Sequence, residues 1–253
     1  MENLSNKKSP IISLKSVYII SKRIRSKKLK DSFLTLKRTI NILRYPVKNI
    51  SLDVNKGEII GIVGDNGSGK TTLLKTIAGI LTPNKGAVVC KDRATALLSL
   101  KAGTDKNLSG LQNIYIIGYL NGFTKEEIKA KESAIIKFSG LAKKMQKLYT
   151  TYTDIEKKQL VFSIYLFLNK KIFLIDNLLS TGNKIFKTAA KEKMSKIIHN
   201  KNKTVIFTAT PKAVLKENCD RVLWLSNGRI REIGEPDIVV KKYLAYIQKK
   251  HST

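Results

Sequence analysis

The 253-residue sequence has little cysteine, few acidic residues and no long apolar run. Its two cysteines, Cys90 and Cys219, are too few for the disulfide framework of a small secreted domain and are typical of reduced thiols. The longest apolar run, residues 160–168, is about half as long as a segment that crosses a bilayer. The N-terminal residues lack the positive-then-apolar order of a secretory signal. We therefore expect a cytosolic chain without membrane spans.

Acidic residues are scarce relative to basic ones, with 19 Asp and Glu against 48 Lys and Arg and a net charge of +29. One explanation is binding to nucleic acid or to an anionic membrane face; the other is residue bias, because lysines occur along the whole chain. The densest cluster is "SKRIRSKKLK" at 21–30, which is either a functional basic arm or a solvated basic face. The sequence lacks the aromatic pattern of RNA-binding modules and the Cys/His spacing of zinc modules, so no specific nucleic acid is expected.

Hydrophobic periodicity and turn residues predict strands that alternate with helices, without a long linker or an internal repeat. The predicted strands are 11–20, 45–64 with a turn at Asn55–Gly57, 87–90, 172–176, 204–210 and a hairpin over 221–234 that turns at Asn227–Gly228. The predicted helices are 69–81, 111–123, 124–141 with a capping box from Thr124 to Glu127, 156–168, 184–199 and 211–218. This alternation indicates an α/β protein with a mainly parallel sheet and a helical insertion.

A phosphate-binding loop is the clearest chemical motif. The stretch "GDNGSGKTT" matches G-x-x-x-x-G-K-[ST] through Gly64, Gly69, Lys70 and Thr71. Its glycines, including Gly67, let backbone N–H groups surround phosphate oxygens, while the following helix presents its positive end. Lys70 would reach the terminal phosphates and the Thr71 hydroxyl would ligate Mg²⁺. A chance match is disfavoured because an apolar strand precedes the loop and an amphipathic helix follows it. The predicted nucleotide-binding residues are Gly64, Asp65, Asn66, Gly67, Ser68, Gly69, Lys70, Thr71 and Thr72.

A carboxylate ends a later apolar strand, "IFLID", at Asp176. By itself an acid at a strand end is weak evidence of a site. Behind a phosphate loop in the same parallel sheet, however, Asp176 could hold the same Mg²⁺, usually through a water molecule. The predicted metal-site residues are therefore Thr71 and Asp176.

These motifs resemble the ATP-binding subunits of ABC transporters, most of all the subfamily that exports capsule polysaccharide, O-antigen or teichoic acid across bacterial cytoplasmic membranes. Residues 50–88 follow the general pattern, while "LSGLQNI" at 108–114 and residues 219–243 match the subfamily. The resemblance covers about Ile11 to Tyr246. It implies a P-loop NTPase (RecA-like) core with an antiparallel β subdomain and an inserted α-helical subdomain.

The resemblance also implies how the protein works and where. Residues 1–253 would form a single ABC-type nucleotide-binding domain, with an N-terminal strand and basic arm over 1–48 and the helical subdomain over about 104–168. Its cofactors would be ATP and Mg²⁺. It would form a homodimer or heterodimer, dock on an integral-membrane permease, and lie peripherally on the cytoplasmic face of the bacterial cell membrane. ATP hydrolysis would be coupled to export of a polysaccharide or teichoic acid.

One departure from the family lies in its signature motif, a glycine-containing helix start that closes on the γ-phosphate held by the other subunit. The aligned stretch here is "YTDIE", residues 152–156. The β-branched Ile155 would obstruct the backbone amides. Asp154 and Glu156 place carboxylates at the positive helix end, where they repel a phosphate. We interpret Thr153 and Asp154 as a plain helix N-cap.

Four further positions differ from the family pattern. Asn177 stands where the family has a catalytic glutamate, and an amide can orient a water molecule but cannot accept its proton. Thr210 replaces the switch histidine and Ser99 the Gln or Glu that couples nucleotide to permease. Asn183 replaces the Asp of a loop between subunits. No residue is therefore predicted to be catalytic. We expect weak or absent hydrolysis, because both composite sites contain substitutions in a homodimer and in a heterodimer.

Three functions remain open from the sequence. The first is an exporter subunit with weak hydrolysis, the second a nucleotide-binding regulatory or scaffold protein, and the third a basic nucleic-acid-binding ABC-type protein. The aromatic ring that stacks on adenine is also open, since Tyr18 and Tyr45 both lie upstream of the loop and either could simply pack. Trp224 is predicted to belong to the core or to an interface.

Overall fold

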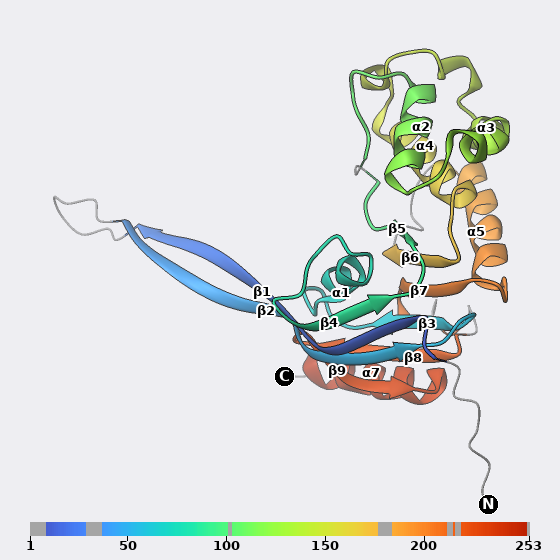
Figure 1. The fold of residues 1–253 in the computed structure, drawn as a ribbon. Coiled ribbons are helices and arrows are strands. Elements are labelled where there is room, and N and C mark those ends of the chain that lie inside the picture. Colours follow the sequence, from blue (N-terminus) through green and yellow to red (C-terminus); the bar gives the residue numbers. More distant parts are fainter. Residues whose placement is uncertain are drawn as a thin grey trace, which may run out of the picture.

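The computed structural model describes residues 9–28, 37–100, 103–176, 184–211, 215 and 219–251, with residues 22–28, 37–42 and 251 described by their backbone alone. Two sheets and a group of helices make up this part of the chain (Figure 1). Among the described residues, no helix is both long and apolar enough to cross a membrane.

The larger sheet is mainly parallel, as predicted. Its strand order is β5-β6-β7-β3-β8-β9, and only the β8–β9 hairpin, which turns at Asn227–Gly228, is antiparallel. The strands are β3 (Ile59–Val63), β5 (Ala94–Leu97), β6 (Ile172–Asp176), β7 (Thr204–Thr208), β8 (Arg221–Ser226) and β9 (Arg229–Gly234). The central strands are continuous apolar runs because both of their faces are covered. The carboxyl ends of β3, β6 and β7 lie side by side, and this edge positions the site described below.

The smaller sheet is antiparallel, with β1 (Ile12–Lys28) between β2 (Lys37–Val54) and β4 (Lys85–Cys90). Its buried face packs with helix α1 (Lys70–Ile77) and with one face of the larger sheet, in a core that includes Leu14, Ile50, Leu73 and Leu174. The helix that carries the predicted phosphate loop is therefore held between the two sheets.

Three helices are inserted between β5 and β6 and lie together at one end of the molecule (Figure 1). They are α2 (Gly110–Leu120), α3 (Lys125–Ser139) and α4 (Asp154–Phe167), with short 3₁₀ turns at Ala142–Lys144 and Tyr149–Thr151. The predicted capping box of Thr124 and Glu127 is present at the start of α3. Helix α5 (Lys184–Ile198) follows β6 and packs in the same core as α4, through Phe186 and Phe162.

Several elements differ from the sequence predictions. The strand predicted at 11–20 continues through the basic arm to Lys28, and β2 begins at Lys37, eight residues before the predicted start. Basic and polar residues outnumber apolar ones in these segments, so their pairing with each other was not recognised. Strand β5 and the C-terminal helix α7 (Pro236–His251) were not predicted. The helix predicted at 211–218 lies largely outside the described residues.

A partly buried ion pair joins the two sheets below the amino end of β3. The Glu58 carboxylate accepts hydrogen bonds from Nε of Arg221 and from the Asn55 N–H, the latter at 2.7 Å. The Arg221 guanidinium also donates to the Asp53 carbonyl of β2 at 2.7 Å. Arg221 therefore connects β8 to β2 while neutralising a carboxylate that is only 9% exposed.

Arg221→Met is expected to lower the free energy of unfolding by about 3 kcal/mol, because it leaves the Glu58 charge buried without its partner. The measurement is urea unfolding followed by circular dichroism. The double variant Arg221→Met/Glu58→Gln should recover part of this loss, since it removes the uncompensated charge. A double variant as unstable as the single one would show that the charge is not the cause.

Candidate functional site

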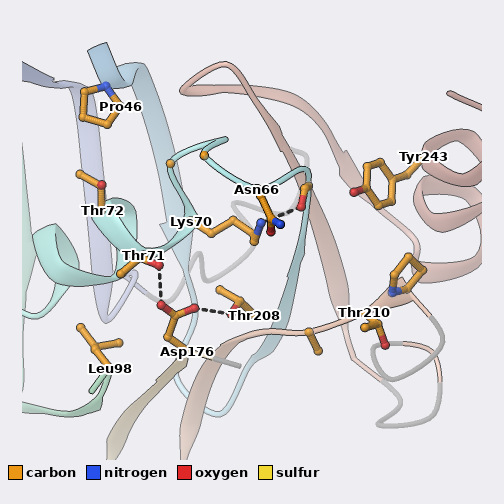
Figure 2. A pocket seen from close by; sticks show the side chains of 15 residues that line it. Pro46, Asn66, Lys70, Thr71, Thr72, Leu98, Asp176, Thr208, Thr210 and Tyr243 are labelled. Carbon is orange, nitrogen blue, oxygen red and sulfur yellow. Dashed lines mark hydrogen bonds between the residues drawn. The ribbon is translucent and has the colours of Figure 1, made fainter. Parts of the chain in front are cut away.

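A cavity of about 650 Å³ opens at the carboxyl edge of the larger sheet, above β3, β6 and β7. Seven of the nine predicted loop residues line it, namely Gly64, Asn66, Gly67, Gly69, Lys70, Thr71 and Thr72. Asp65 and Ser68 do not line it. The cavity therefore gathers the phosphate loop, the end of β6 and the segment after β7 in one place (Figure 2).

The loop is packed backbone to backbone against its neighbours. Gly69 has a φ of 107°, and a Cβ there would lie 1.9 Å from the Pro46 carbonyl oxygen of β2. A Cβ at Gly64 would lie 2.2 Å from the Leu225 carbonyl oxygen of β8. A Cβ at Gly67, by contrast, would meet no heavy atom of the described residues within 4 Å. Gly64 and Gly69 are thus required by close packing, while Gly67 faces open space.

Helix α1 begins at the loop, and its positive end has no side-chain cap. Its N-cap residue is Gly69, no side chain of the fully described helix or loop caps it, and its first turn carries no acid. Backbone N–H groups at such an end, together with the helix dipole, bind anions. The start of α1 is therefore suited to a phosphate.

Lys70 lies over the loop, where its Nζ donates hydrogen bonds to the carbonyl oxygens of Gly64 (2.6 Å) and Asp65 (2.9 Å). Burial lowers the pKa of Lys70, and the negative charges of Asp176 and Asp65 act in the opposite direction. An anion in the cavity would offer this ammonium a stronger partner than two carbonyls.

The two predicted metal-site residues lie in direct contact. The Asp176 carboxylate accepts hydrogen bonds from the hydroxyls of Thr71 and Thr208, each at 2.5 Å (Figure 2). Thr208, buried at the end of β7, was missed by the sequence analysis; the only signal was a hydroxyl at the end of an apolar strand adjacent to β6. A carboxylate and hydroxyl oxygens are ligands that Mg²⁺ prefers, so these residues fit that ion.

One hydroxyl of the phosphate loop is buried without a hydrogen-bond partner among the described residues. This is the Oγ of Ser68, which lies 2.9 Å from the position that a Cβ of Gly64 would take. Buried polar atoms in folded proteins are nearly always paired, so the Ser68 hydroxyl is an exception that lies within the loop.

The C-terminal helix α7 also reaches the loop. Asp65 accepts hydrogen bonds from the Tyr243 hydroxyl (3.2 Å) and from Nζ of Lys250 (2.7 Å). The Lys250 hydrogen bond lowers the pKa of Asp65. Burial, followed by the charge of Asp65, raises the pKa of Tyr243 to about 12. Asp65 thus holds the loop to α7. Tyr243 lines the cavity, whereas Asp65 does not.

The aromatic residues singled out in the sequence lie in different places relative to the cavity. Neither Tyr18 nor Tyr45 lines the cavity, whereas Tyr243, which was not predicted, does. Its spacing from Val239 and Tyr246 follows helical periodicity, which could have identified α7. Trp224 is 3% exposed and its ring lies 5.4 Å from that of Tyr243, which confirms its place in the core.

The start of α4 contrasts with that of α1. Glu156 N–H donates to the Thr153 hydroxyl (3.2 Å), and the Thr153 N–H donates to the Glu156 carboxylate (2.8 Å), a reciprocal capping box. Nζ of Lys144 donates to Glu156 at 2.6 Å, and this bond is the main reason that the pKa of Glu156 is lowered. The N-cap interpretation of Thr153 is confirmed, with Asp154 in the first turn and Ile155 56% exposed.

The four other positions that differ from the family pattern do not lie together in the described structure. Thr210 is exposed and lines the cavity after β7. Ser99 lines a second cavity of about 1140 Å³ between the end of α1 and the end of α2. Asn177 and Asn183 lie outside the described residues.

The parallel sheet, the phosphate loop and the carboxylate at the end of β6 define a P-loop NTPase. A family model described as "ABC transporter" matches residues 47–180. The chain belongs to this ABC transporter family. Solved structures agree in fold: a dimeric ATP-binding cassette bound to ADP and Pi matches with a TM-score of 0.66 at 18% identity, over 89% of this chain and 98% of that one.

Curated relatives are named for export. The teichoic acids export ATP-binding protein TagH of Bacillus cereus is 37% identical over 223 residues, which cover 88% of this chain and 40% of the relative. The O-antigen export system ATP-binding protein RfbB of Myxococcus xanthus is 34% identical over 78% of this chain and 45% of its own length. A second RfbB, from Klebsiella pneumoniae, is 29% identical over 85% of this chain and 89% of its own. The chain thus spans about two fifths of the length of the Bacillus relative.

Gly69→Ala is expected to destabilise the protein more than Gly67→Ala. Both residues have positive φ, so each alanine costs about 1–2 kcal/mol of backbone strain, but only Gly69 is also packed against a backbone carbonyl. Urea unfolding of the two variants gives the comparison. Equal losses would contradict the close packing of the loop against β2.

Tyr243→Phe is expected to change how stability depends on alkaline pH. Because the folded pKa of Tyr243 is raised from 10.0 to about 12, its contribution is fully present below pH 10 and is lost as the pH rises through 12. The phenylalanine variant lacks this loss, while the other tyrosines are common to both proteins. The gap in free energy of unfolding between the two should therefore narrow over this range. A constant gap would indicate an unperturbed hydroxyl.

Proposed function

We propose that this chain is the ATP-binding subunit of an ABC-type exporter of a cell-surface polysaccharide or teichoic acid, and that it binds MgATP but hydrolyses it weakly. The observation that carries nucleotide binding is the cavity in which an uncapped helix start, the Lys70 ammonium and the Thr71–Asp176 pair converge. The names of the relatives support the substrate class.

The roles of the individual residues follow from their positions. The backbone N–H groups of the loop and of α1 would hold phosphate oxygens, with Lys70 moving from its two carbonyl partners to the terminal phosphates. Thr71 and Asp176 would hold Mg²⁺, which supplies charge neutralisation for the phosphates when bound. Thr208 positions Asp176 by donating to its other oxygen.

Weak hydrolysis is supported by the start of α4 and by two substitutions. The Glu156 N–H in the first turn of α4 already has a partner in the Thr153 hydroxyl, and two carboxylates occupy that turn, so this end would repel the phosphate of a second subunit. Thr210 cannot act as the family's histidine does, and Asn177 cannot accept a proton. A dimer, a permease partner and a peripheral place on the cytoplasmic face of the membrane are further parts of the proposal.

A second candidate is a nucleotide-binding regulatory or scaffold protein. The observation that favours it is the same self-capped start of α4, which removes the element that couples two subunits through nucleotide. Binding of nucleotide without association with any permease would select this function over the exporter.

The test pairs a binding assay with a turnover assay on the purified chain, alone and with its permease. Lys70→Ala is expected to weaken binding of a fluorescent ATP analogue by about tenfold to a hundredfold, the cost of a charge-assisted hydrogen bond. The matched control is Lys75→Ala, on the same helix but outside the cavity. Phosphate release is expected to be about 10²–10⁴ below that of an intact homologue. Turnover equal to the homologue's and abolished by Lys70→Ala would refute weak hydrolysis.

A further inference from the structure

The basic arm forms a two-stranded ribbon with an unusual composition. Residues 21–28 of β1 pair with residues 37–44 of β2, from Ser21 opposite Arg44 to Lys28 opposite Lys37. These sixteen residues contain eight basic and no acidic residues. The basic ones are Lys22, Arg23, Arg25, Lys27, Lys28, Lys37, Arg38 and Arg44.

The ribbon leaves the body of the protein. Strand β4 accompanies β1 only as far as Tyr18, so beyond that point β1 and β2 pair only with each other among the described residues. Register shifts between Leu14 and Ser21, with positive φ at Ser16 and Asn49, bend the strands where the ribbon departs. Figure 1 shows it projecting from the smaller sheet, away from the helices. Eight residues of strand extend it by about 27 Å.

The ribbon's length makes its charge hard to explain within the chain. Electrostatic interactions between exposed charges are largely screened beyond about 8 Å at physiological ionic strength, so acids on the body cannot neutralise most of the ribbon. Lysines can protect free strand edges against pairing with another chain. A few charges suffice to protect a strand edge, so the ribbon, which also carries Arg23, Arg25 and Arg38, has more charges than edge protection needs. The ribbon is therefore complementary to an extended anionic surface.

We propose that this ribbon binds the anionic headgroups of a membrane. Four apolar residues lie among the basic ones, at Ile24, Ile40, Ile42 and Leu43, and the Leu43 side chain is 52% exposed. Basic residues mixed with aliphatic ones are typical of segments at the lipid interface. The sixteen residues contain no aromatic ring on which a nucleic-acid base could stack. The preference for lipid over nucleic acid rests in part on the proposed function at a membrane transporter.

The experiment measures co-sedimentation of the full chain with vesicles. Binding is expected to vesicles of phosphatidylglycerol and phosphatidylcholine in equal parts, not to phosphatidylcholine alone, and to weaken as salt rises. The variant Arg23→Gln/Arg25→Gln/Lys27→Gln should reduce partitioning by about a hundredfold, at about fivefold for each charge near the surface. The control Lys187→Gln/Lys191→Gln/Lys196→Gln removes the same charge from the exposed side of α5 and should change partitioning by less than about twofold, because these residues lie off the ribbon.

Three results would overturn the proposal. Equal losses in the two triple variants would show that net charge alone drives binding. Stronger binding to a DNA duplex than to the anionic vesicles would assign the ribbon to nucleic acid. Self-association of the ribbon variant without any vesicle binding by the parent chain would assign its charges to edge protection.

Nucleotide binding, measured on the same samples, separates this proposal from the proposed function. Lys70→Ala should bind nucleotide more weakly but keep vesicle binding, whereas the ribbon variant should bind nucleotide as the parent chain does. A parent chain that binds vesicles but no nucleotide would refute the proposed function and leave the ribbon's anionic-lipid binding standing.

Discussion

The phosphate loop packs backbone to backbone against two neighbouring strands, and the arrangement of the sheets and the cavity depends on this contact. Gly69 lies against the Pro46 carbonyl of β2, and Gly64 against the Leu225 carbonyl of β8. The hairpin turn at Gly228 completes the contact, because its N–H donates to the Ser68 carbonyl (2.9 Å) and its carbonyl accepts from the Lys48 N–H (2.7 Å). These contacts therefore hold the loop and the two sheets in register. They leave no room for a side chain at Gly64 or Gly69.

The starts of two helices show how the same backbone element can be prepared for a ligand or closed to one. Helix α1 has a glycine N-cap, no capping side chain and no acid in its first turn, and its first three residues line the cavity. Helix α4 begins with a reciprocal capping box, two acids and a lysine bound to one of them. In the dimer that we propose, a phosphate would be attracted by the first and repelled by the second. The contrast supports binding of nucleotide with little hydrolysis.

The sequence identified those parts of the site that are encoded in short contiguous stretches. The loop, Asp176, the capping box of α3 and the N-cap of α4 each occupy a few neighbouring residues with distinctive chemistry, and the structure places the loop and Asp176 around one cavity. Thr208 and Tyr243 were missed because their roles depend on which strand lies beside β6 and on how α7 returns to the loop. The ribbon was missed as structure because its few apolar residues lie among basic and polar ones without a continuous core-facing pattern, although its charge was noticed.

The central claim is that the site holds MgATP while the water beside it lacks an effective base. The most direct measurement is to bind ATP to the purified chain with Mg²⁺, incubate it for many turnover times of an active homologue, and identify the bound nucleotide by chromatography. The account predicts that ATP is recovered intact and that Lys70→Ala retains less of it, in line with its weaker binding. Recovery of ADP from the parent chain, at the rate of an active homologue, would contradict it.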